Sequence, residues 1–286
     1  MTSARSKLSV AVLLSLAGCA RSSLVASERP ALVVVAAGDI APPSIGRQED
    51  TAQLVEAIKP AAVLVAGDSQ YGAGLPEEFA LGYAPTWGRF KAITHPAPGN
   101  HEYKSGAAGY FAYFGASAGE PDKGYYSFEL GDWHFVALNT GDLCQSVGCE
   151  EGSPQLAWLE ADLAATKREC VLAFFHHPRW NSGHHGPFLR ADALWKTLAR
   201  HRVELVVNGH EHFYERMAPI NGIVQFTVGT GGISFSDFST PIPQSLVRQN
   251  DTFGVLKLEL GASTWRAEFV PVRGATFTDH TSGRCR

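Results

Sequence analysis

Residues 31–39, ALVVVAAGD, and residues 61–71, AAVLVAGDSQY, decide the fold of this chain. Each stretch begins with a short, wholly apolar run rich in β-branched residues, which predicts a buried strand. Residues 48–59, between them, repeat apolar side chains at helical spacing. A strand, a helix and a second strand in this order predict a parallel pair covered by helices, and therefore an α/β fold.

Outward from this unit, further apolar runs predict more strands and helices. Strands are expected at residues 93–96, 125–130, 133–139, 171–175, 203–207, 223–228, 253–260 and 265–270, and helices at 154–165 and 188–201. The steps Gly131-Asp132 and Gly261-Ala262 each join two alternating runs and predict hairpin turns. The fold class is therefore mixed α/β, with parallel units first and antiparallel hairpins later.

The length and composition are those of a globular protein. The 286 residues leave room for one large domain or two small ones. We expect one domain over residues 31–286, because no linker-like stretch follows residue 30. The formal charge of -4 and the absence of a Lys/Arg run in the sequence predict no nucleic-acid partner.

The N-terminus has the layout of an export signal. Arg5 and Lys7 precede an apolar stretch, residues 8–17, that is too short to span a bilayer as a stable helix. The stretch ends in Leu16-Ala17-Gly18-Cys19, which resembles the lipobox of bacterial lipoproteins. That resemblance implies a lipid on Cys19, the first residue of the mature chain.

Two interpretations of this segment follow. In the first, residues 1–19 are a lipoprotein-type signal peptide and residues 20–30 a flexible tether. The protein would then be exported and held at the membrane, on the periplasmic side or the cell surface, only through the anchor on Cys19. The alternative is a plain signal peptide cut after a small residue such as Ala26.

Export would place the remaining four cysteines in an oxidising compartment, where an even number favours disulfides. Cys144 and Cys149 bracket a glycine-containing loop that is short enough to close on itself, so we pair them. Cys170 with Cys285 follows by elimination and would join the C-terminus to the domain. The alternative is four free, buried thiols.

Metal-capable side chains directly follow five of the apolar runs. The five segments are Gly38-Asp39, Gly67-Asp68-Ser69-Gln70-Tyr71, Gly99-Asn100-His101-Glu102, His176-His177-Pro178 and Asn208-Gly209-His210-Glu211-His212. Because parallel strands bring their carboxyl ends to one edge of a sheet, we expect these side chains to converge. One such segment alone predicts a turn, a helix cap or a core histidine, but five in this order are hard to obtain from packing. Their oxygen and nitrogen atoms suit Zn, Fe, Mn or Co.

As a set, these segments resemble the five motifs of calcineurin-like metallophosphoesterases. Tyr71, three residues after the second Asp, indicates the purple acid phosphatases within that superfamily. The resemblance spans about residues 30–272. It implies a four-layer α/β/β/α sandwich of two mixed β-sheets flanked by helices, with a dinuclear metal centre on the strand ends.

The resemblance also implies a role for each ligand. The first metal would be held by Asp39, Asp68, Tyr71 and His212, and the second by Asp68, Asn100, His176 and His210. Asp68 would bridge the two metals. His176 is preferred because the family's ligand stands two residues before the proline, and His177 is the alternative. A phenolate favours a trivalent ion, so we expect Fe(III) at the Tyr71 site and Fe, Zn or Mn at the second site.

Position 41 departs from the family's pattern. Many metallophosphoesterases have a histidine two residues after the first Asp, where this chain has Ala41. Tyr71 replaces that ligand in the purple acid phosphatases, which usually have glycine at this place, so Ala41 is a small departure from them too. The chain is also expected to lack the extra N-terminal β-domain of the larger members.

Three histidines are candidates to protonate the leaving alkoxide. His101 follows a predicted ligand, and His184 and His185 lie eight and nine residues after His176. The family places substrate-contacting and acid histidines at such positions, and their ordinary pKa suits proton transfer. Each could instead be an ordinary loop histidine. Glu102 is expected either to orient His101 or to face solvent.

These features predict a metal-dependent phosphoric ester hydrolase of the acid-phosphatase type, acting on a small phosphorylated substrate. A phosphodiesterase or nucleotidase on the same centre is the second interpretation, and an inactive metal-binding surface scaffold the third. Specificity is expected to reside in loops at residues 72–88, 104–123 and 233–250. Residues 229–232 are expected to form a turn beside the site, in preference to a phosphate cradle.

Overall fold

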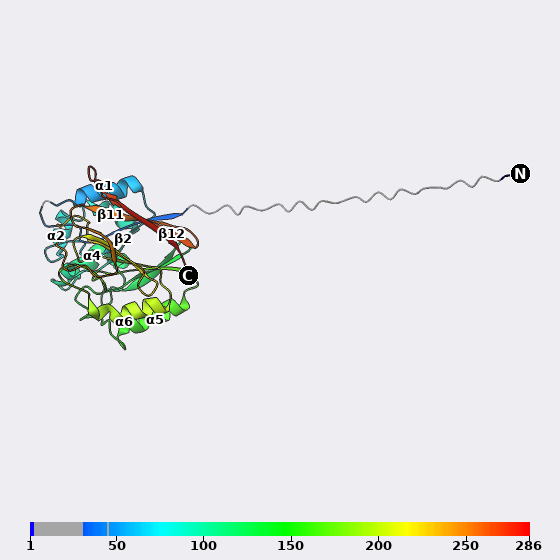
Figure 1. Cartoon of the computed structure of the whole chain (residues 1–286). Helices are drawn as coiled ribbons and strands as arrows, with labels where there is room; N and C mark the ends of the chain where they lie inside the picture. The colour runs from blue at the N-terminus through cyan, green and yellow to red at the C-terminus, as the bar shows by residue number, and fades with distance from the viewer. Residues whose placement is uncertain (3–30, 45) are drawn as a thin grey trace.

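Two β-sheets pack against each other, and helices cover their outer faces (Figure 1). In this computed structural model, residues 1–2, 31–44 and 46–286 are described, so the predicted signal peptide, the tether and Cys19 lie outside the described residues. None of the described helices is long and apolar enough to cross a membrane. The predicted four-layer α/β/β/α sandwich is confirmed.

The first sheet contains the unit that begins the domain. Its strand order is β13-β12-β11-β1-β2-β3, in which β1, β2 and β3 are parallel and the C-terminal strands join antiparallel. The strands are β1 (Leu32–Ala37), β2 (Ala62–Ala66), β3 (Thr94–Ala97), β11 (Gly254–Leu260), β12 (Thr264–Pro271) and β13 (Asp279–Arg284). Helix α1 (Gln48–Ile58) connects β1 to β2, as predicted.

The second sheet has a parallel centre and antiparallel edges. Its order is β10-β8-β9-β7-β6-β5-β4, with β5, β6, β7 and β9 parallel. The strands are β4 (Tyr126–Leu130), β5 (Trp133–Ala137), β6 (Cys170–Phe174), β7 (Leu205–Asn208), β8 (Tyr214–Met217), β9 (Val224–Val228) and β10 (Ser245–Gln249). Both predicted hairpins, β4–β5 and β11–β12, are present.

Alternating residues of the second sheet fill two hydrophobic layers. Phe135 and Leu172 face the first sheet and join its core, whereas Val136 and Val171 face the helices α5 and α6. These helices, α5 (Pro154–Ala165) and α6 (Asp192–Arg200), lie on the side opposite α1 (Figure 1). Because successive side chains of a strand point to opposite faces, both faces of the sheet are buried.

Both predicted disulfides are present. The Cα atoms of Cys144 and Cys149 are 5.5 Å apart, and those of Cys170 and Cys285 are 5.3 Å apart. Since Cys170 begins β6 and Cys285 follows β13, the second disulfide joins the two sheets covalently.

The prediction that residues 72–88 and 104–123 are loops was wrong. They contain α2 (Pro76–Leu81), α4 (Ala108–Phe114), the 3₁₀ helix Gly115–Ala118 and the start of the 3₁₀ helix Trp87–Ile93. Buried aromatic rings hold them together, with ring centroids 5.8 Å apart for Phe79 and Phe114 and 5.5 Å apart for Tyr83 and Phe114. Six- and seven-residue helices are too short to show a periodic pattern.

Five other elements differ from the predictions, and the first is α3 (Asn100–Tyr103), a single helical turn that was not predicted. The helix expected at 188–201 begins as the 3₁₀ turn Leu189–Ala191 and continues as α6. Strands β8, β10 and β13 were not predicted. The last two are edge strands, and neither has the continuous apolar run that marks a buried strand.

Candidate metal centre

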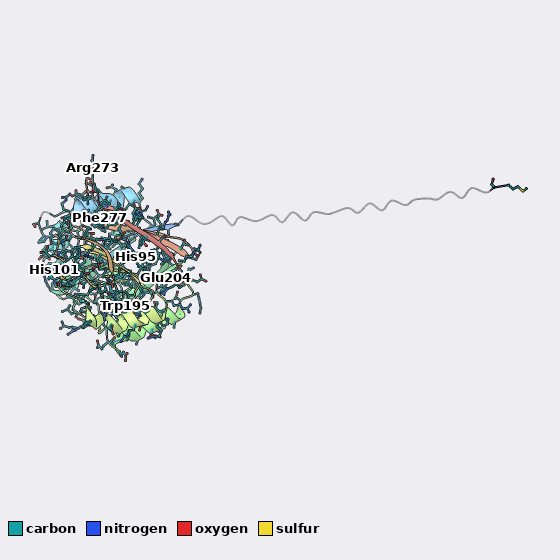
Figure 2. All side chains as sticks on the ribbon, viewed as in Figure 1. His95, His101, Trp195, Glu204, Arg273 and Phe277 are labelled. Atoms are coloured by element: carbon teal, nitrogen blue, oxygen red, sulfur yellow. A yellow bond between two sulfur atoms is a disulfide. The ribbon has the colours of Figure 1, made fainter. Side chains whose placement is uncertain are left out.

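Five strands, β1, β2, β3, β6 and β7, end at one rim of the sandwich, and the five predicted segments follow them there. We call this rim the metal rim. His101, which belongs to it, lies at one edge of the molecule in Figure 2, on the side of α2 and α4 in Figure 1. Three of the predicted ligands have positive φ angles: 59° at Asp39, 49° at Asp68 and 71° at His210. Non-glycine residues rarely adopt this conformation, so the surrounding loops must hold it in place.

Backbone hydrogen bonds hold the loops after β1 and β2 together. The N–H groups of Asp39 and Ala41 donate to the carbonyls of Gly67 and Ser69, at 3.2 and 3.1 Å. Tyr71 N–H donates in turn to the carbonyl of Ala41 at 2.8 Å. The parallel pairing thus continues beyond the strands and carries Tyr71 to the metal rim. Ala41 is buried within this pairing, so its methyl group fits beside Tyr71.

Asp39, Tyr71 and His212 form the first ligand set. Tyr71 Oη lies 2.6 Å from Asp39 Oδ1 and 2.8 Å from His212 Nε2, and these last two atoms are 3.5 Å apart. Ligand atoms bound at about 2.0–2.2 Å around one cation lie roughly 3 Å from each other. The spacing and the oxygen-nitrogen chemistry therefore fit a single metal ion.

Asn100, His176 and His210 form the second ligand set. Asn100 Oδ1 is 2.9 Å from His176 Nε2 and 3.0 Å from His210 Nδ1. Asp68 Oδ2 lies 3.3 Å from His176 Nε2, and ligand atoms of Asp39, Asp68 and His176 all lie within 4.8 Å of one another. Asp68 is thus positioned between the two sets. Its other oxygen accepts the His101 N–H at 2.8 Å, which fixes the orientation of the carboxylate.

Contacts behind the ligands determine which ring nitrogen faces the centre. His176 Nδ1 lies 3.0 Å from the Ala66 carbonyl, so its Nε2 is directed at the second set. His212 Nδ1 lies 3.0 Å from Ser234 Oγ, so its Nε2 faces the first set. His177 also has a ring nitrogen within 4.8 Å of those of His176 and His210, but its Nδ1 lies 3.1 Å from Thr140 Oγ1, whereas His176 Nε2 contacts both Asn100 and Asp68. The geometry therefore favours His176 over His177 as the ligand.

Burial shifts the ionisation of the whole centre. It raises the pKa of Asp39 to about 7, and together with Asp39 and Asp68 it raises the pKa of Tyr71 well above its ordinary value. Burial alone would lower the pKa of His176, but the Asp68 carboxylate outweighs it and raises that pKa to about 9. Conversely, burial would raise the pKa of Asp68, but His176 holds it below its usual range. A bound cation would favour the ionised forms of Asp39 and Tyr71.

The three predicted proton donors lie around the two ligand sets. The ring of His101 is 4.1 Å from that of Tyr71, beside the first set. The ring of His185 is 4.6 Å from that of His210, beside the second set. The ring of His184 is 3.8 Å from that of His185. All three side chains are therefore close to the space where a substrate would meet the ligands.

Both predictions for Glu102 were wrong. Its side chain is fully buried, and its carboxylate accepts the N–H groups of Gly99 at 2.7 Å and of Asp68 and Gln70 at 3.1 Å. Glu102 thus joins the loops after β2 and β3 and holds the backbone of the bridging ligand. Burial raises its pKa to about 7. Neither local pattern nor spacing revealed this role, because two of the three partners, Asp68 and Gln70, come from another loop.

Glu211 is a site residue that the sequence analysis missed. It is fully buried, its Oε1 lies 3.3 Å from His185 Nδ1 and its Oε2 lies 4.0 Å from His184 Nδ1. Its position between two predicted ligands, in His210-Glu211-His212, was the available signal. This carboxylate therefore lies within ion-pair distance of both histidines.

Residues 229–232 form the predicted turn beside the site. The N–H groups of Gly229 and Gly231 donate to the carbonyls of Phe213 and Gly38, at 3.1 and 3.0 Å. These groups are therefore occupied within the fold and are not free to hold a phosphate.

Comparison with known proteins agrees with this geometry. The family model described as "Calcineurin-like phosphoesterase" matches residues 32–214, which include every residue of both ligand sets. The chain belongs to this family. The resemblance inferred from the five segments is thereby confirmed.

Curated relatives of this phosphoesterase include plant and bacterial proteins. Purple acid phosphatase 23 of Arabidopsis thaliana is 31% identical over 219 residues, which cover 60% of this chain and 47% of the relative. An uncharacterised protein of Mycobacterium tuberculosis is 33% identical over 171 residues, which cover 52% of this chain and 30% of that protein. The phosphoesterase thus spans less than half the length of these relatives.

Solved structures share its fold. The purple acid phosphatase PPD1 of yellow lupin aligns with a TM-score of 0.70 at 22% identity, over 87% of this chain and 53% of that one. A dimetal phosphatase of Danio rerio aligns with a TM-score of 0.61 at 16% identity, over 87% of this chain and 99% of that one. GAP50, described as the anchor in the inner membrane complex of Plasmodium, aligns at 0.67 and 16% identity, over 88% of each chain. Because an anchor shares the fold, catalysis must be argued from the site itself.

Proposed function

We propose that this phosphoesterase hydrolyses small phosphomonoesters with two metal ions, one in each ligand set. The observation that carries the proposal is the convergence of seven side chains into two sets with ligand spacing. Asp68 lies between the sets, in the position required of a shared ligand. A binding scaffold would not need the three histidines that surround these sets.

The chain's own residues would position the substrate and move protons. When bound, two cations would supply positive charge to the phosphoryl oxygens and activate water. His185, oriented by Glu211, would protonate the leaving alkoxide, with His184 beside it. His101 Nδ1 lies 3.1 Å from the Gly72 carbonyl, so a protonated His101 would donate from its Nε2 to a phosphoryl oxygen on the side of Tyr71.

Positive charge beside the first ligand set supports a monoester. Lys104 Nζ lies 3.0 Å from His101 Nδ1 and 3.1 Å from its Nε2. A monoester carries one more anionic oxygen than a diester, so it gains more from this charge. Diester hydrolysis on the same centre is the alternative.

The donors of the first ligand set support Fe(III) there, with Fe, Zn or Mn in the second set. Asp39, Asp68 and Tyr71 would together offer three negative charges to one ion. Since burial and both carboxylates hold the pKa of Tyr71 well above its ordinary value, a strongly Lewis-acidic cation is needed to ionise it. A trivalent ion meets that need better than a divalent one.

We also propose that the protein is exported and anchored through a lipid on Cys19. The two disulfides support an oxidising compartment. Expression in a bacterial host with labelled palmitate tests the anchor. The wild-type chain is expected to incorporate label and fractionate with membranes, whereas Cys19→Ala is expected to do neither.

Metal analysis and a visible spectrum of the purified protein, together with a panel of monoesters and diesters, test the activity. We expect about two metals per chain, a charge-transfer band from an Fe(III)–phenolate pair, and faster turnover of monoesters. Tyr71→Phe is expected to remove the band.

Tyr103→Phe is a matched control, because the Tyr103 hydroxyl accepts a hydrogen bond from Asn139 away from the ligand sets. It is expected to leave the band in place. A metal-loaded protein that turns over no phosphate ester would contradict the proposal, and faster turnover of diesters would favour the alternative.

A further inference from the structure

A small cavity lies beside the second ligand set. Its volume is about 400 Å³, toward the lower end of the ~300–1,000 Å³ typical of small-molecule sites. Asn100 and His210 line it, and so does His185. A group bound here would therefore adjoin the phosphoryl group and lie within reach of the proposed proton donor.

The rest of the cavity wall is largely apolar. It is formed by Leu143, Pro178, Pro187 and Phe188, together with His177. Among the lining residues that the structure describes, none is Lys, Arg, Asp or Glu. The rings of His177 and Phe188 are 4.8 Å apart and inclined at 31°. Such a wall suits a flat apolar group better than a sugar or a second phosphate.

The disulfide loop holds Leu143 at the cavity. Leu143 and Cys144 have φ angles of 59° and 62°, so both adopt the left-handed conformation. Arg190 Nη1 donates to the Leu143 carbonyl at 2.8 Å, which ties this loop to the segment that carries Phe188. Residues without a strong preference for this conformation keep it because their surroundings hold them. The two sides of the cavity are thus fixed to each other.

One polar atom of the wall has no partner. His177 is 1% exposed, and both its N–H and its Nδ1 contact Thr140 Oγ1 at 3.1 Å. Its Nε2 has no hydrogen-bond partner among the residues described. Since buried polar atoms are nearly always paired, an unpaired one on a cavity wall indicates a place for a polar atom of a ligand.

We propose that this cavity receives the leaving group of the substrate, and that the phosphoesterase prefers monoesters of aromatic alcohols. The inference rests on the proposed phosphomonoesterase function. The aromatic ring would pack against Leu143 and Phe188, and its polar substituent would meet His177 Nε2. Hydrolysis breaks the P–O bond to the aryl oxygen, and water oxygen replaces it on phosphorus. His185 gives its proton to the aryloxide and regains one from the water.

Equilibrium binding to the metal-loaded protein, measured by titration calorimetry, tests this inference. The probes are inorganic phosphate, phenylphosphonate and methylphosphonate. The two phosphonates are not hydrolysed and differ in the group that they offer to the cavity. Phenylphosphonate is expected to bind at least about tenfold more tightly than methylphosphonate, because its ring is removed from water. Leu143→Ser is expected to reduce that ratio about three- to tenfold and to leave phosphate binding unchanged.

Leu189→Ser is the matched control. Leu189 is also an exposed leucine of this region, at 68% compared with 41% for Leu143, and it is not among the lining residues. It is expected to leave the ratio unchanged. Equal binding of both phosphonates by a protein that binds phosphate would overturn the cavity inference. An equal drop in the affinity ratio of the two phosphonates in both leucine variants would overturn it too. A metal-loaded protein that binds no phosphate would instead overturn the proposed function.

Discussion

Two regions of the molecule join the same pair of sheets by different means. At the metal rim, Asp39 and Asp68 of the first sheet face His176 and His210 of the second, through atoms spaced for cations. The second region, residues 279–286, is called the C-terminal seam. Its Cys285 forms the disulfide to β6, and its Asp279 accepts hydrogen bonds from Arg216 and Tyr214 of β8.

The two regions differ in how their charged groups are paired and in the strain of their backbone. Carboxylates of and beside the seam are hydrogen-bonded within the chain: Arg216 donates to both oxygens of Asp279, and the Arg286 backbone N–H donates to Glu204 at 3.0 Å. Glu204 lies toward the edge of the molecule opposite His101 (Figure 2). The rim combines buried carboxylates with strained backbone at Asp39. We infer that the seam stabilises the sandwich, whereas the rim sacrifices stability for function.

Cavity size does not identify which of the two regions is functional. A hollow of about 1150 Å³ lies at the hairpin between β11 and β12 and includes residues 282–284 of the seam. All three groups of potential metal ligands found among the described residues lie instead at the rim. The chemistry of the lining residues, and not the volume, marks the functional end.

The largest expected effect belongs to the rim. Asp68→Asn should lower turnover of phosphomonoesters by more than about 10³-fold, because both cations lose a shared ligand, and even second-shell changes cost about 10–100-fold. Metal content and kinetics of the purified variant measure this. The far-UV spectrum should stay that of a folded protein. If Asp68→Asn turned over phosphomonoesters as fast as the wild type, the claim that the rim carries the activity would be wrong.

Loss of the seam disulfide should give the largest change in stability. Chain entropy predicts that Cys170→Ser with Cys285→Ser lowers the free energy of unfolding by about 5 kcal/mol, since 115 residues separate the cysteines. Cys144→Ser with Cys149→Ser, with a separation of 5, should lower it by about 2 kcal/mol. Denaturant titrations compare the two pairs. A seam variant that folds but loses turnover even at low temperature would contradict a purely stabilising role.

The metal-free protein should lose stability as the pH rises from about 7 to 9. The raised pKa of Asp39, about 7, and of His176, about 9, mean that the folded state binds more protons than the unfolded chain in this window. Thermal unfolding after chelation measures the slope, which Asp39→Asn should reduce. Histidines with lowered pKa, such as His210 and His212, oppose this loss near pH 7, but they are largely neutral in both states above about pH 7.5 and contribute little there. A pH-independent melting temperature would contradict this account of the rim.

The smallest expected effect comes from Asp279→Asn, the same chemical change as Asp68→Asn but at the seam. It should lower the free energy of unfolding by about 1–3 kcal/mol, because it weakens charged hydrogen bonds, and should leave turnover unchanged. Although burial opposes it, the hydrogen bond from Arg216 lowers the pKa of Asp279, so this stabilisation is present above about pH 4 and is lost below it. Urea titrations should therefore show a smaller difference from wild type at pH 3 than at pH 7.

Much of the fold was predictable because its signals are local. Apolar runs with a period of two or of 3.6 marked most strands and helices, and the Gly-Asp and Gly-Asn steps marked where strands end. Helices α2 and α4 were missed, since their short sequences are stabilised by ring contacts between Phe79, Tyr83 and Phe114 from separate elements. Long-range packing of this kind leaves no pattern in a short window.

At the site, too, local sequence signals were predictable and long-range contacts were not. By itself the sequence determined which residues could bind metals, because five segments carry the ligand types, and it favoured the disulfide pairs that the structure shows, because Cys144 and Cys149 bracket a short loop. Only the tertiary structure decided that Glu102 holds the backbone of Asp68, that Glu211 lies beside His185, and that Leu143 forms a cavity wall. Hydrogen-bond partners and burial depend on how the two sheets and their loops meet in space, and residues that meet there are far apart along the chain.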